Sequence, residues 1–533
     1  MRPYRLALLA VLAAAPFLPA PAQSQEKRPD LVIAVNQLPP GLEPLMHSGN
    51  VTVRLTYSIF DTLLRRDFLN PLPGGGSRLV PSLAESWERT GPNQVVFKLR
   101  KGVKFSNGAD FTADDVLFTF SDERMLGKDG VMNGREYFGH LEKVEALDPY
   151  TVRFTTKGPD LIFEQRLATY GAWIVSKKAW EDAGKAGAPN GDRKAQIKAG
   201  LDHYLRNPVG TGPYKFKEWK EGRQIELVAN DDYFGGKPVA GRAIFREIPE
   251  LSTRIAALVS GEVDMIVNVD PDQFDILAGY KDIAVKSVPL NNSHAIVFNV
   301  FDPVLKDKRI RQALSLAIDR KAMIDSLWHG KAVTPNGHQL PEFGQMYDKD
   351  RKGYVFDRAK AKQLLAEAGY KGQEVTIRFI PNYYSLGTEA MQVVQQQWKE
   401  AGVNAKLVAL ENFPQVRAEG LMTYAWSQTF RLPDPAGAVL ILWGKESATQ
   451  VQYKHWKTTP DFDKWADAVL TGATMQERAQ AFPKLLDVFE DEMPVTLLYN
   501  ALESYAMKKG VDWTPYPMYY MDLRSDVLKS IKK

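Results

Sequence analysis

The chain of 533 residues contains no cysteine, so no disulfide bond, thiol nucleophile or cysteine-bound lipid is available to it. It also lacks an excess of charge of either sign, with 68 basic and 64 acidic residues. That balance argues against nucleic acid as a partner and against a polybasic surface for binding membranes. The chain has enough residues for a large core and for several domains of the usual size of about 100–200 residues.

The N-terminus has the pattern of a cleavable secretory signal peptide. Arg2 and Arg5 precede an apolar run, Leu6–Leu18, which is too short to span a bilayer. Small residues at Ala20–Ala22 then suit a signal peptidase. A buried helix or an uncleaved anchor is the alternative, although the prolines beside the run would break a helix. We therefore expect residues 1–22 to be removed, giving a periplasmic protein without a lipid anchor.

Motifs for catalysis and metal binding are missing from the sequence. Its seven histidines form no H-x-x-x-H arrangement, and there is no G-x-S-x-G nucleophile motif. Gly210 and Gly212 are not followed by the Gly-Lys-Ser/Thr of a phosphate-binding loop. We expect no metal, no cofactor and no enzymatic activity.

One segment, Ser77–Phe120, carries two strand patterns and a helix start in close succession. Apolar residues alternate in Gln94–Leu99, which predicts a strand with one buried face. A Lys-Gly turn follows, and Val103–Phe105 is expected to pair back on that strand. Thr112 and Asp115 have the spacing of a capping box at the start of a helix.

Elsewhere strands and helices alternate, as in an α/β fold. The continuous apolar run Leu31–Val35 predicts a strand that is buried on both faces. Further along, strand Glu374–Ile380, helix Thr388–Ala401 and strand Asn404–Leu410 form a β-α-β unit. Such a unit requires a parallel pair of strands and a right-handed crossover.

Three segments together resemble a known family: Ser77–Phe120, Asn207–Pro238 and Gly261–Ile266. The chain is similar there to the extracytoplasmic solute-binding proteins of peptide- and nickel-type ABC importers, solute-binding family 5. The resemblance implies an α/β, two-lobed periplasmic binding protein fold with an extra subdomain in the first lobe. It also implies that two crossing strands join the lobes, and we place them near Val288–Val300 and Pro494–Tyr499.

The resemblance further predicts how the chain divides. The expected parts are a signal peptide at 1–22, lobe I at 23–80, 191–290 and 498–533, an extra subdomain of lobe I at 81–190, and lobe II at 291–497.

The same resemblance implies a receptor that captures a small polar solute by hinge closure and delivers it to a membrane ABC permease with its ATPase. Peptides, opines and modified amino acids are the expected solute class. We expect a monomer that does not insert into the membrane. The alternatives are an extracytoplasmic enzyme, a solute-specific chaperone and a sensor subunit on the same scaffold.

Candidate solute contacts in the first lobe are Gln37 and Leu38, in the loop after the first strand, and Tyr57 on the following helix. Ligands of open α/β sheets bind beyond the carboxyl ends of strands. His294 near the first crossing strand and Tyr383 at the end of another strand complete this set.

In the second lobe the candidates are Trp426, Arg431 and Asp434, and the Pro-Asp-Pro turn is expected to hold the last two close together. Peptide-binding relatives resemble W-x-x-D, in which the Asp neutralises the amino terminus of the peptide. This chain has no carboxylate in Ser427–Phe430. Because burying an ammonium group without a counter-charge is costly, we expect instead a solute whose anionic group meets Arg431 and whose apolar part stacks on Trp426.

Overall fold

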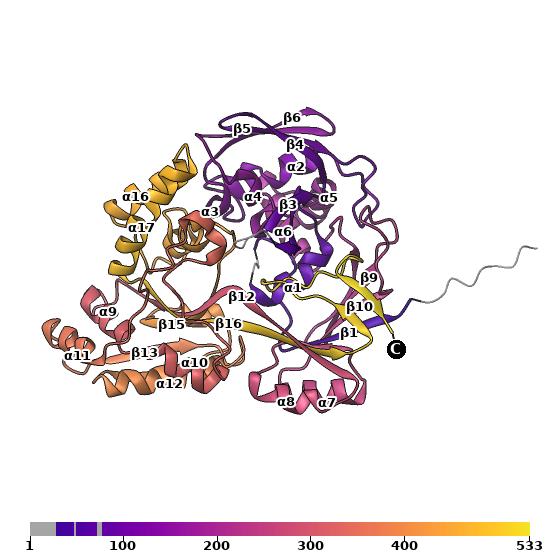
Figure 1. Cartoon of the computed structure of the whole chain (residues 1–533). Coiled ribbons are helices and arrows are strands. Elements are labelled where there is room, and N and C mark those ends of the chain that lie inside the picture. The colour runs from indigo at the N-terminus through magenta and orange to yellow at the C-terminus, as the bar shows by residue number, and fades with distance from the viewer. Residues whose placement is uncertain (1–27, 47–48, 72–76, 533) are drawn as a thin grey trace, which may run out of the picture.

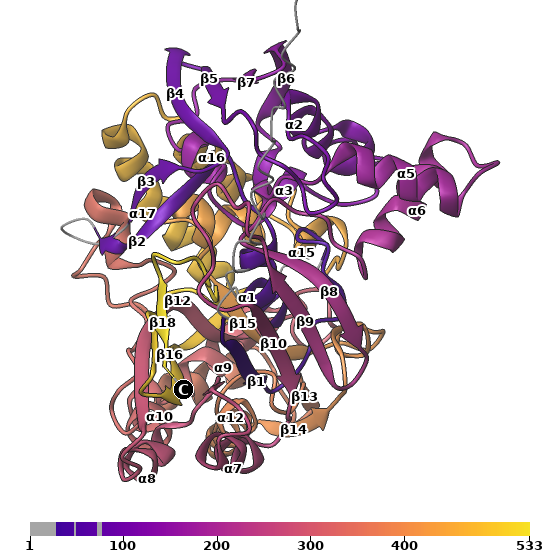
Figure 2. The same cartoon turned by 90° about the vertical axis from the view of Figure 1, so that its right-hand side faces the viewer.

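The computed structural model describes residues 28–46, 49–71 and 77–532, so the expected signal peptide lies outside the described residues. Ten strands form one long mixed sheet in the order β14-β13-β15-β12-β16-β11-β1-β10-β9-β8. Helices cover both of its ends, which form two lobes (Figures 1 and 2). Within the described ranges no helix is long and apolar enough to cross a bilayer.

The strands of the long sheet have the following bounds: β1 Asp30–Val35, β8 Tyr214–Lys220, β9 Gln224–Ala229, β10 Arg242–Glu247, β11 Met265–Ile266, β12 Ile283–Phe298, β13 Glu374–Phe379, β14 Asn404–Ala409, β15 Thr423–Thr429 and β16 Val495–Lys508. Smaller sheets contain β2 Leu64–Pro71 and β3 Ser77–Pro81; β4 Ala84–Gly91, β5 Gln94–Leu99, β6 Leu141–Asp148 and β7 Thr151–Thr156; and β17 Val511–Trp513 with β18 Leu528–Ile531.

The helices of the first lobe are α1 Asn50–Ile59, α2 Ala113–Thr119, α3 Arg135–Phe138, α4 Phe163–Arg166, α5 Lys177–Gly187, α6 Arg193–Tyr204, α7 Leu251–Ser260 and α8 Phe274–Ala278. Those of the second lobe are α9 Lys308–Leu316, α10 Arg320–Trp328, α11 Arg358–Glu367, α12 Gly387–Glu400, α13 Phe413–Val416, α14 Ile441–Trp443, α15 Ala448–Val451, α16 Pro460–Thr471 and α17 Met475–Glu492.

Strand β1 explains its own continuous apolar sequence. It pairs in parallel with β10 on one side and β11 on the other, at the centre of the first lobe's half of the sheet. Leu31 and Ile33 are fully buried, and so is Ala34, which points to the opposite face. A strand that is covered on both faces by other elements cannot alternate with polar residues.

Two long antiparallel strands, β12 and β16, connect the lobes (Figure 1). They remain paired from Ile283 opposite Lys508 to Val297 opposite Val495, and the register shifts between Pro289 and Ser293. The predicted two-lobed fold with two crossing strands is therefore confirmed. The proposed domain boundaries stay a prediction.

The four-stranded sheet of the first lobe has the order β4-β5-β7-β6. The alternation in β5 is confirmed, because Val95, Phe97 and Leu99 are buried. The expected pairing of Val103–Phe105 with β5 is wrong: β5 lies between β4 and β7, and Phe105 instead pairs forward with Ala109. Two partners from elsewhere in the chain already fill both edges of β5.

Local signals for helices were more reliable. Thr112 and Asp115 form the predicted capping box of α2, and the Thr112 amide donates to Asp115 Oδ2 at 3.0 Å. The β-α-β unit of β13, α12 and β14 is also confirmed, since β13 and β14 pair in parallel.

Gly210 and Gly212 have a packing role. A Cβ atom on Gly210 would lie 2.1 Å from the carbonyl oxygen of Ile59, and one on Gly212 would lie 2.6 Å from the same atom. The Gly212 amide donates to that carbonyl at 2.9 Å. These glycines let the chain press against the C-terminal end of α1 and fix that helix at the lobe interface.

Candidate binding site between the two lobes

A chain of neutral hydrogen bonds joins the lobes where α1, β12 and β15 meet. The Asn50 amide donates to Ser427 Oγ at 3.0 Å, and Ser427 Oγ donates to Asn292 Oδ1 at 3.1 Å. The Asn292 amide in turn donates to Thr429 Oγ1 at 2.9 Å. We call these four buried residues the amide–hydroxyl chain. Because each comes from a separate element or strand position, the chain forms only when the lobes are together.

Tyrosines surround this chain on the side of the first lobe. Tyr57 stacks on Tyr520 with 4.1 Å between ring centroids, and Tyr170 lies 5.4 Å from Tyr520. Burial raises the pKa of Tyr170, while the nearby hydroxyls of Thr429 and Tyr520 act to lower it. The Tyr170 hydroxyl is close to both groups but makes no well-formed hydrogen bond with a described residue.

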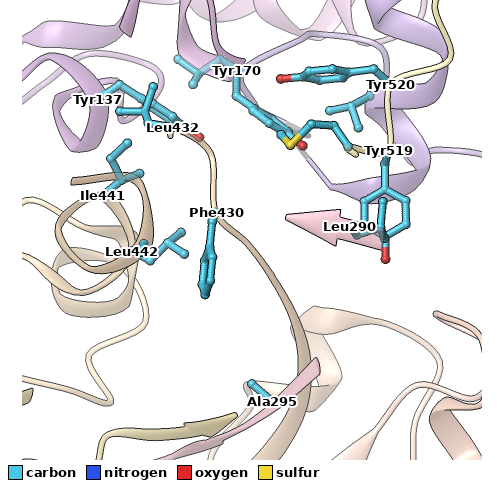
Figure 3. Packing of buried hydrophobic residues seen from close by; sticks show 14 of the residues in the cluster. Tyr137, Tyr170, Leu290, Ala295, Phe430, Leu432, Ile441, Leu442, Tyr519 and Tyr520 are labelled. Carbon is cyan, nitrogen blue, oxygen red and sulfur yellow. The ribbon is translucent and has the colours of Figure 1, made fainter. Parts of the chain in front are cut away.

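Tyr519 extends the same aromatic wall towards β15. Burial, and then the charge of Glu503, raise the pKa of Tyr519, whereas the Ser427 hydroxyl acts to lower it. Burial also raises the pKa of Tyr57 to about 12. These tyrosines are therefore uncharged hydroxyl groups at neutral pH. Figure 3 shows Tyr170, Tyr519 and Tyr520 on the side of the first lobe and Phe430 facing them from the second.

Arg431 links the loop after β15 to the extra subdomain. Its guanidinium lies 3.4 Å from Glu136 and between the rings of Tyr137 and Tyr170, at 5.2 and 5.1 Å. Burial raises the pKa of Glu136 and Arg431 acts to lower it, while burial lowers the pKa of Arg431. The Thr169 hydroxyl also donates to the Arg431 carbonyl at 2.9 Å. Arg431 thus takes part in a contact between the lobes.

The expected proximity of Arg431 to Asp434 as an ion pair is wrong. Asp434 accepts two hydrogen bonds from Arg478 of α17, both at 2.8 Å, and both side chains are buried. Asp434 Oδ1 also accepts from the Ala436 amide at 2.9 Å. The Pro-Asp-Pro turn therefore anchors its acidic residue inside the second lobe.

Trp426 lies on the opposite face of β15 from Ser427 and Thr429, as the alternation of a strand requires. It is half-buried and meets Trp443 edge-on, with 6.0 Å between ring centroids. The structure does not bring the Trp426 ring to the amide–hydroxyl chain.

The remaining predicted contacts are scattered. Gln37 is exposed and Leu38 is buried in the core, whereas Tyr57 belongs to the tyrosine wall. Tyr383 packs edge-on against Phe413 at 5.0 Å. Burial raises its pKa to about 12.

His294 is buried in an aromatic pocket beside the crossing strands. Its ring centroid is 3.7 Å from that of Tyr384 and 5.1 Å from that of Tyr499. Neither ring nitrogen has a hydrogen-bond partner among the described residues, and burial lowers the pKa of His294 to about 3. It is therefore a neutral imidazole. In the described part of the chain no group of three or more His, Asp or Glu side chains could hold a metal ion.

Sequence reasoning did not select Asn50, Asn292, Tyr170, Tyr519 and Tyr520 as leading candidates. Asn50 is the first residue of α1, and Asn292 lies in the middle of a crossing strand. The paired tyrosines 519 and 520 offered a usable signal, since they stand in an irregular, aromatic-rich segment near the C-terminus. Buried tyrosines with free hydroxyls are typical of binding sites.

Known proteins share this architecture. Residues 78–450 match the bacterial extracellular solute-binding proteins, family 5. The chain is 28% identical over 536 residues to di/tripeptide-binding protein 3 of Pseudomonas aeruginosa, covering 95% of this chain and 96% of that protein.

Two solved structures have the same fold. One is the periplasmic binding protein DppA of Helicobacter pylori in complex with the peptide STSA, with a TM-score of 0.81, 24% identity and coverage of 93% of this chain and 97% of that one. Another is AgaA of A. tumefaciens in complex with agropinic acid, with a TM-score of 0.77, 23% identity and coverage of 92% and 96%. The family match covers more than half of the chain, and the chain belongs to the bacterial extracellular solute-binding proteins of family 5.

Proposed function

We propose that this protein is a periplasmic receptor that encloses a small solute between its lobes and presents it to a membrane ABC permease. The observation that carries the proposal is the amide–hydroxyl chain, whose members come from α1, β12 and β15. A solute that contacts both lobes is bound tightly only by the closed form, so it shifts the hinge equilibrium towards closure.

The receptor acts without chemistry on its solute. The groups that meet at the interface are amides, tyrosine hydroxyls and paired charges, and none of them forms a nucleophile–base pair. The family relationship supports the same proposal, because the relatives named above carry the names of binding proteins. We further propose that residues 1–22 are cleaved on export and that the mature protein is an unlipidated monomer.

The test is to purify the mature protein from periplasm and identify by mass spectrometry any solute that is released on denaturation. The recovered compound is then titrated into the emptied protein, with calorimetry for affinity and small-angle scattering for closure. Compaction on binding and recovery of the unchanged solute support a receptor. Turnover of the solute would instead establish an enzyme on this scaffold. An intact mass and a sedimentation profile check the cleavage after residue 22 and the monomeric state.

A further inference from the structure

The charged side chains at the lobe interface are already neutralised by protein partners. Each buried arginine there faces a glutamate, and each of these arginines also lies near an aromatic ring. The pairs are Arg431 with Glu136 at 3.4 Å, Arg66 with Glu342 at 3.5 Å, and Arg54 with Glu503 at 2.7 Å. The guanidinium carbons lie 5.1 Å from the ring of Tyr170, 4.6 Å from that of Phe68 and 5.4 Å from that of Tyr519, respectively.

Further hydrogen bonds hold two of these glutamates in place. Glu342 accepts from the Asn291 amide at 2.8 Å, and Glu503 accepts from the Asn268 side-chain amide at 3.2 Å. A carboxylate that is held by both an arginine and an amide is costly to displace, because its release would leave several buried donors unpaired. The arginines are therefore poor acceptors for a second anion.

Hydrogen-bonding capacity remains in the same region, and it is uncharged. The hydroxyls of Tyr137 and Tyr170 are buried without hydrogen-bond partners among the described residues. They flank the Arg431 guanidinium and lie on the side of the extra subdomain (Figure 3). Buried polar groups in native proteins are normally satisfied by protein, water or ligand. Two hydroxyls at one place are suited to a donor or acceptor of a bound molecule.

Apolar side chains make up the opposite wall. Figure 3 shows Leu290, Phe430, Leu432 and Leu442 turned towards the region between the tyrosines and the second lobe. All four are buried. An ion that enters such a wall loses its hydration without gaining a counter-charge, whereas an uncharged molecule with some apolar surface is stabilised there.

We propose that the solute of this receptor is an uncharged molecule that bears hydroxyl or amide groups and an apolar or ring face. This inference rests on the proposed receptor function and specifies its ligand class. It replaces the expectation of an anionic group bound by Arg431, because Glu136 already occupies that guanidinium. It also fits position 429, where a threonine hydroxyl stands in the amide–hydroxyl chain and no carboxylate is available for an ammonium group.

The test uses probes in pairs that differ in charge and little else. The pairs are cyclo(Leu-Gly) with the zwitterion Leu-Gly, N-acetyl-leucinamide with N-acetyl-leucine, and maltose with maltobionic acid. Calorimetry on the emptied mature protein is expected to give, for at least one pair, a neutral member that binds at least tenfold more tightly than its charged counterpart. Its Kd should change less than twofold between 50 and 500 mM salt. A charged member that binds as well as its neutral counterpart, or better, overturns the inference and leaves the receptor function standing. Absence of binding in every pair counts against the receptor function, and with it against this inference.

A second experiment changes the charge balance itself. Glu136→Gln leaves Arg431 without its counter-charge, so the affinity for the anionic member of the pair should rise at least fivefold. Glu342→Gln does the same for Arg66 and gives an independent readout if the first variant folds poorly. Glu446→Gln is the matched control, since Glu446 pairs with Arg135 at the exposed rim of the same interface, at 3.1 Å. Unchanged selectivity in both interface variants would show that the glutamates do not set the charge preference.

Discussion

Two buried ion pairs begin in the same loop and differ in what they join. Asp434 and Arg478 lie within the second lobe, two 2.8 Å hydrogen bonds connect them, and their side chains are 2% and 1% exposed. Arg431 and Glu136 join the second lobe to the extra subdomain through one contact of 3.4 Å, and their side chains are 14% and 12% exposed. The first pair is part of a scaffold, and the second exists only while the lobes are closed.

The difference shows what a buried charge can do in a hinged protein. Removing one partner of a fully buried pair leaves an uncompensated ion, which costs about 3–5 kcal/mol. A pair that spans the hinge avoids this penalty by opening, because water then solvates both ions. The first pair should therefore affect unfolding, and the second should affect closure.

Arg478→Ala is expected to have the largest effect. It leaves Asp434 buried without its cation, and the free energy of unfolding should fall by about 3–5 kcal/mol. Urea denaturation followed by tryptophan fluorescence measures this loss. Lys321→Ala is the control, because Lys321 pairs with Asp325 on an exposed helix face, where such a pair contributes about 0.3–0.5 kcal/mol. Equal losses in the two variants would mean that the Asp434 pair is not structural.

Arg431→Ala is expected to act on binding. The closed form loses its contact with Glu136 and with two tyrosine rings. The affinity for the solute should fall about tenfold, which corresponds to about 1.4 kcal/mol, and the melting temperature of the empty protein should stay nearly constant. Calorimetry and thermal denaturation separate the two quantities. A loss of stability as large as that of Arg478→Ala would place this pair in the scaffold as well.

Thr429→Val tests the neutral part of the interface. The substitution keeps the shape of the side chain but leaves the Asn292 amide without its acceptor. A lost neutral hydrogen bond of this kind costs about 1 kcal/mol, so the solute affinity should weaken several-fold. Thr423→Val on the same strand is the control, since its hydroxyl donates to the Thr376 carbonyl within the second lobe. If both variants bind equally well, Thr429 takes no part in closure.

The smallest expected effect concerns Asp270, a carboxyl group near the hinge whose Oδ1 has no hydrogen-bond partner among the described residues. Burial, together with the charges of Asp272 and Glu389, raises the pKa of Asp270 to about 7. A raised pKa gives a contribution to stability that is complete below the ordinary value of 3.8 and is lost as the pH rises through about 7. Asp270→Asn should flatten the decline in unfolding free energy between pH 5 and pH 8, as measured by urea titration at each pH. Asp272→Asn, which removes a charge that raises this pKa, should shift the decline to lower pH and leave it in place.

Much of the fold could be predicted because its signals are local. A capping box such as that of Thr112 and Asp115 needs only four consecutive residues, and the apolar run of β1 directly reports a strand covered on both faces. The pairing of Val103–Phe105 failed because a strand's neighbours depend on distant segments. In this case β7, more than 50 residues away along the chain, occupies the edge of β5.

The site could be predicted only in part, for the same reason. The hydrogen bond from Asn50 to Ser427 joins residues 377 apart, and the pair of Arg431 and Glu136 spans 295 residues. Sequence spacing suggested that Arg431 and Asp434 would share a partner because they are neighbours in the chain. Each side chain instead pairs with a residue from another element, which only the tertiary structure supplies.

The shift in register of the crossing strands affects how easily this molecule can be retuned. Pairing between β12 and β16 is regular up to Pro289 and resumes at Ser293, so a bend in this short stretch need not break rungs of the ladder on either side. The backbone then adds little resistance to opening, and the balance between the two forms is left to side chains in the interface. Single substitutions there can adjust solute capture and release over evolutionary time while the sheet stays intact.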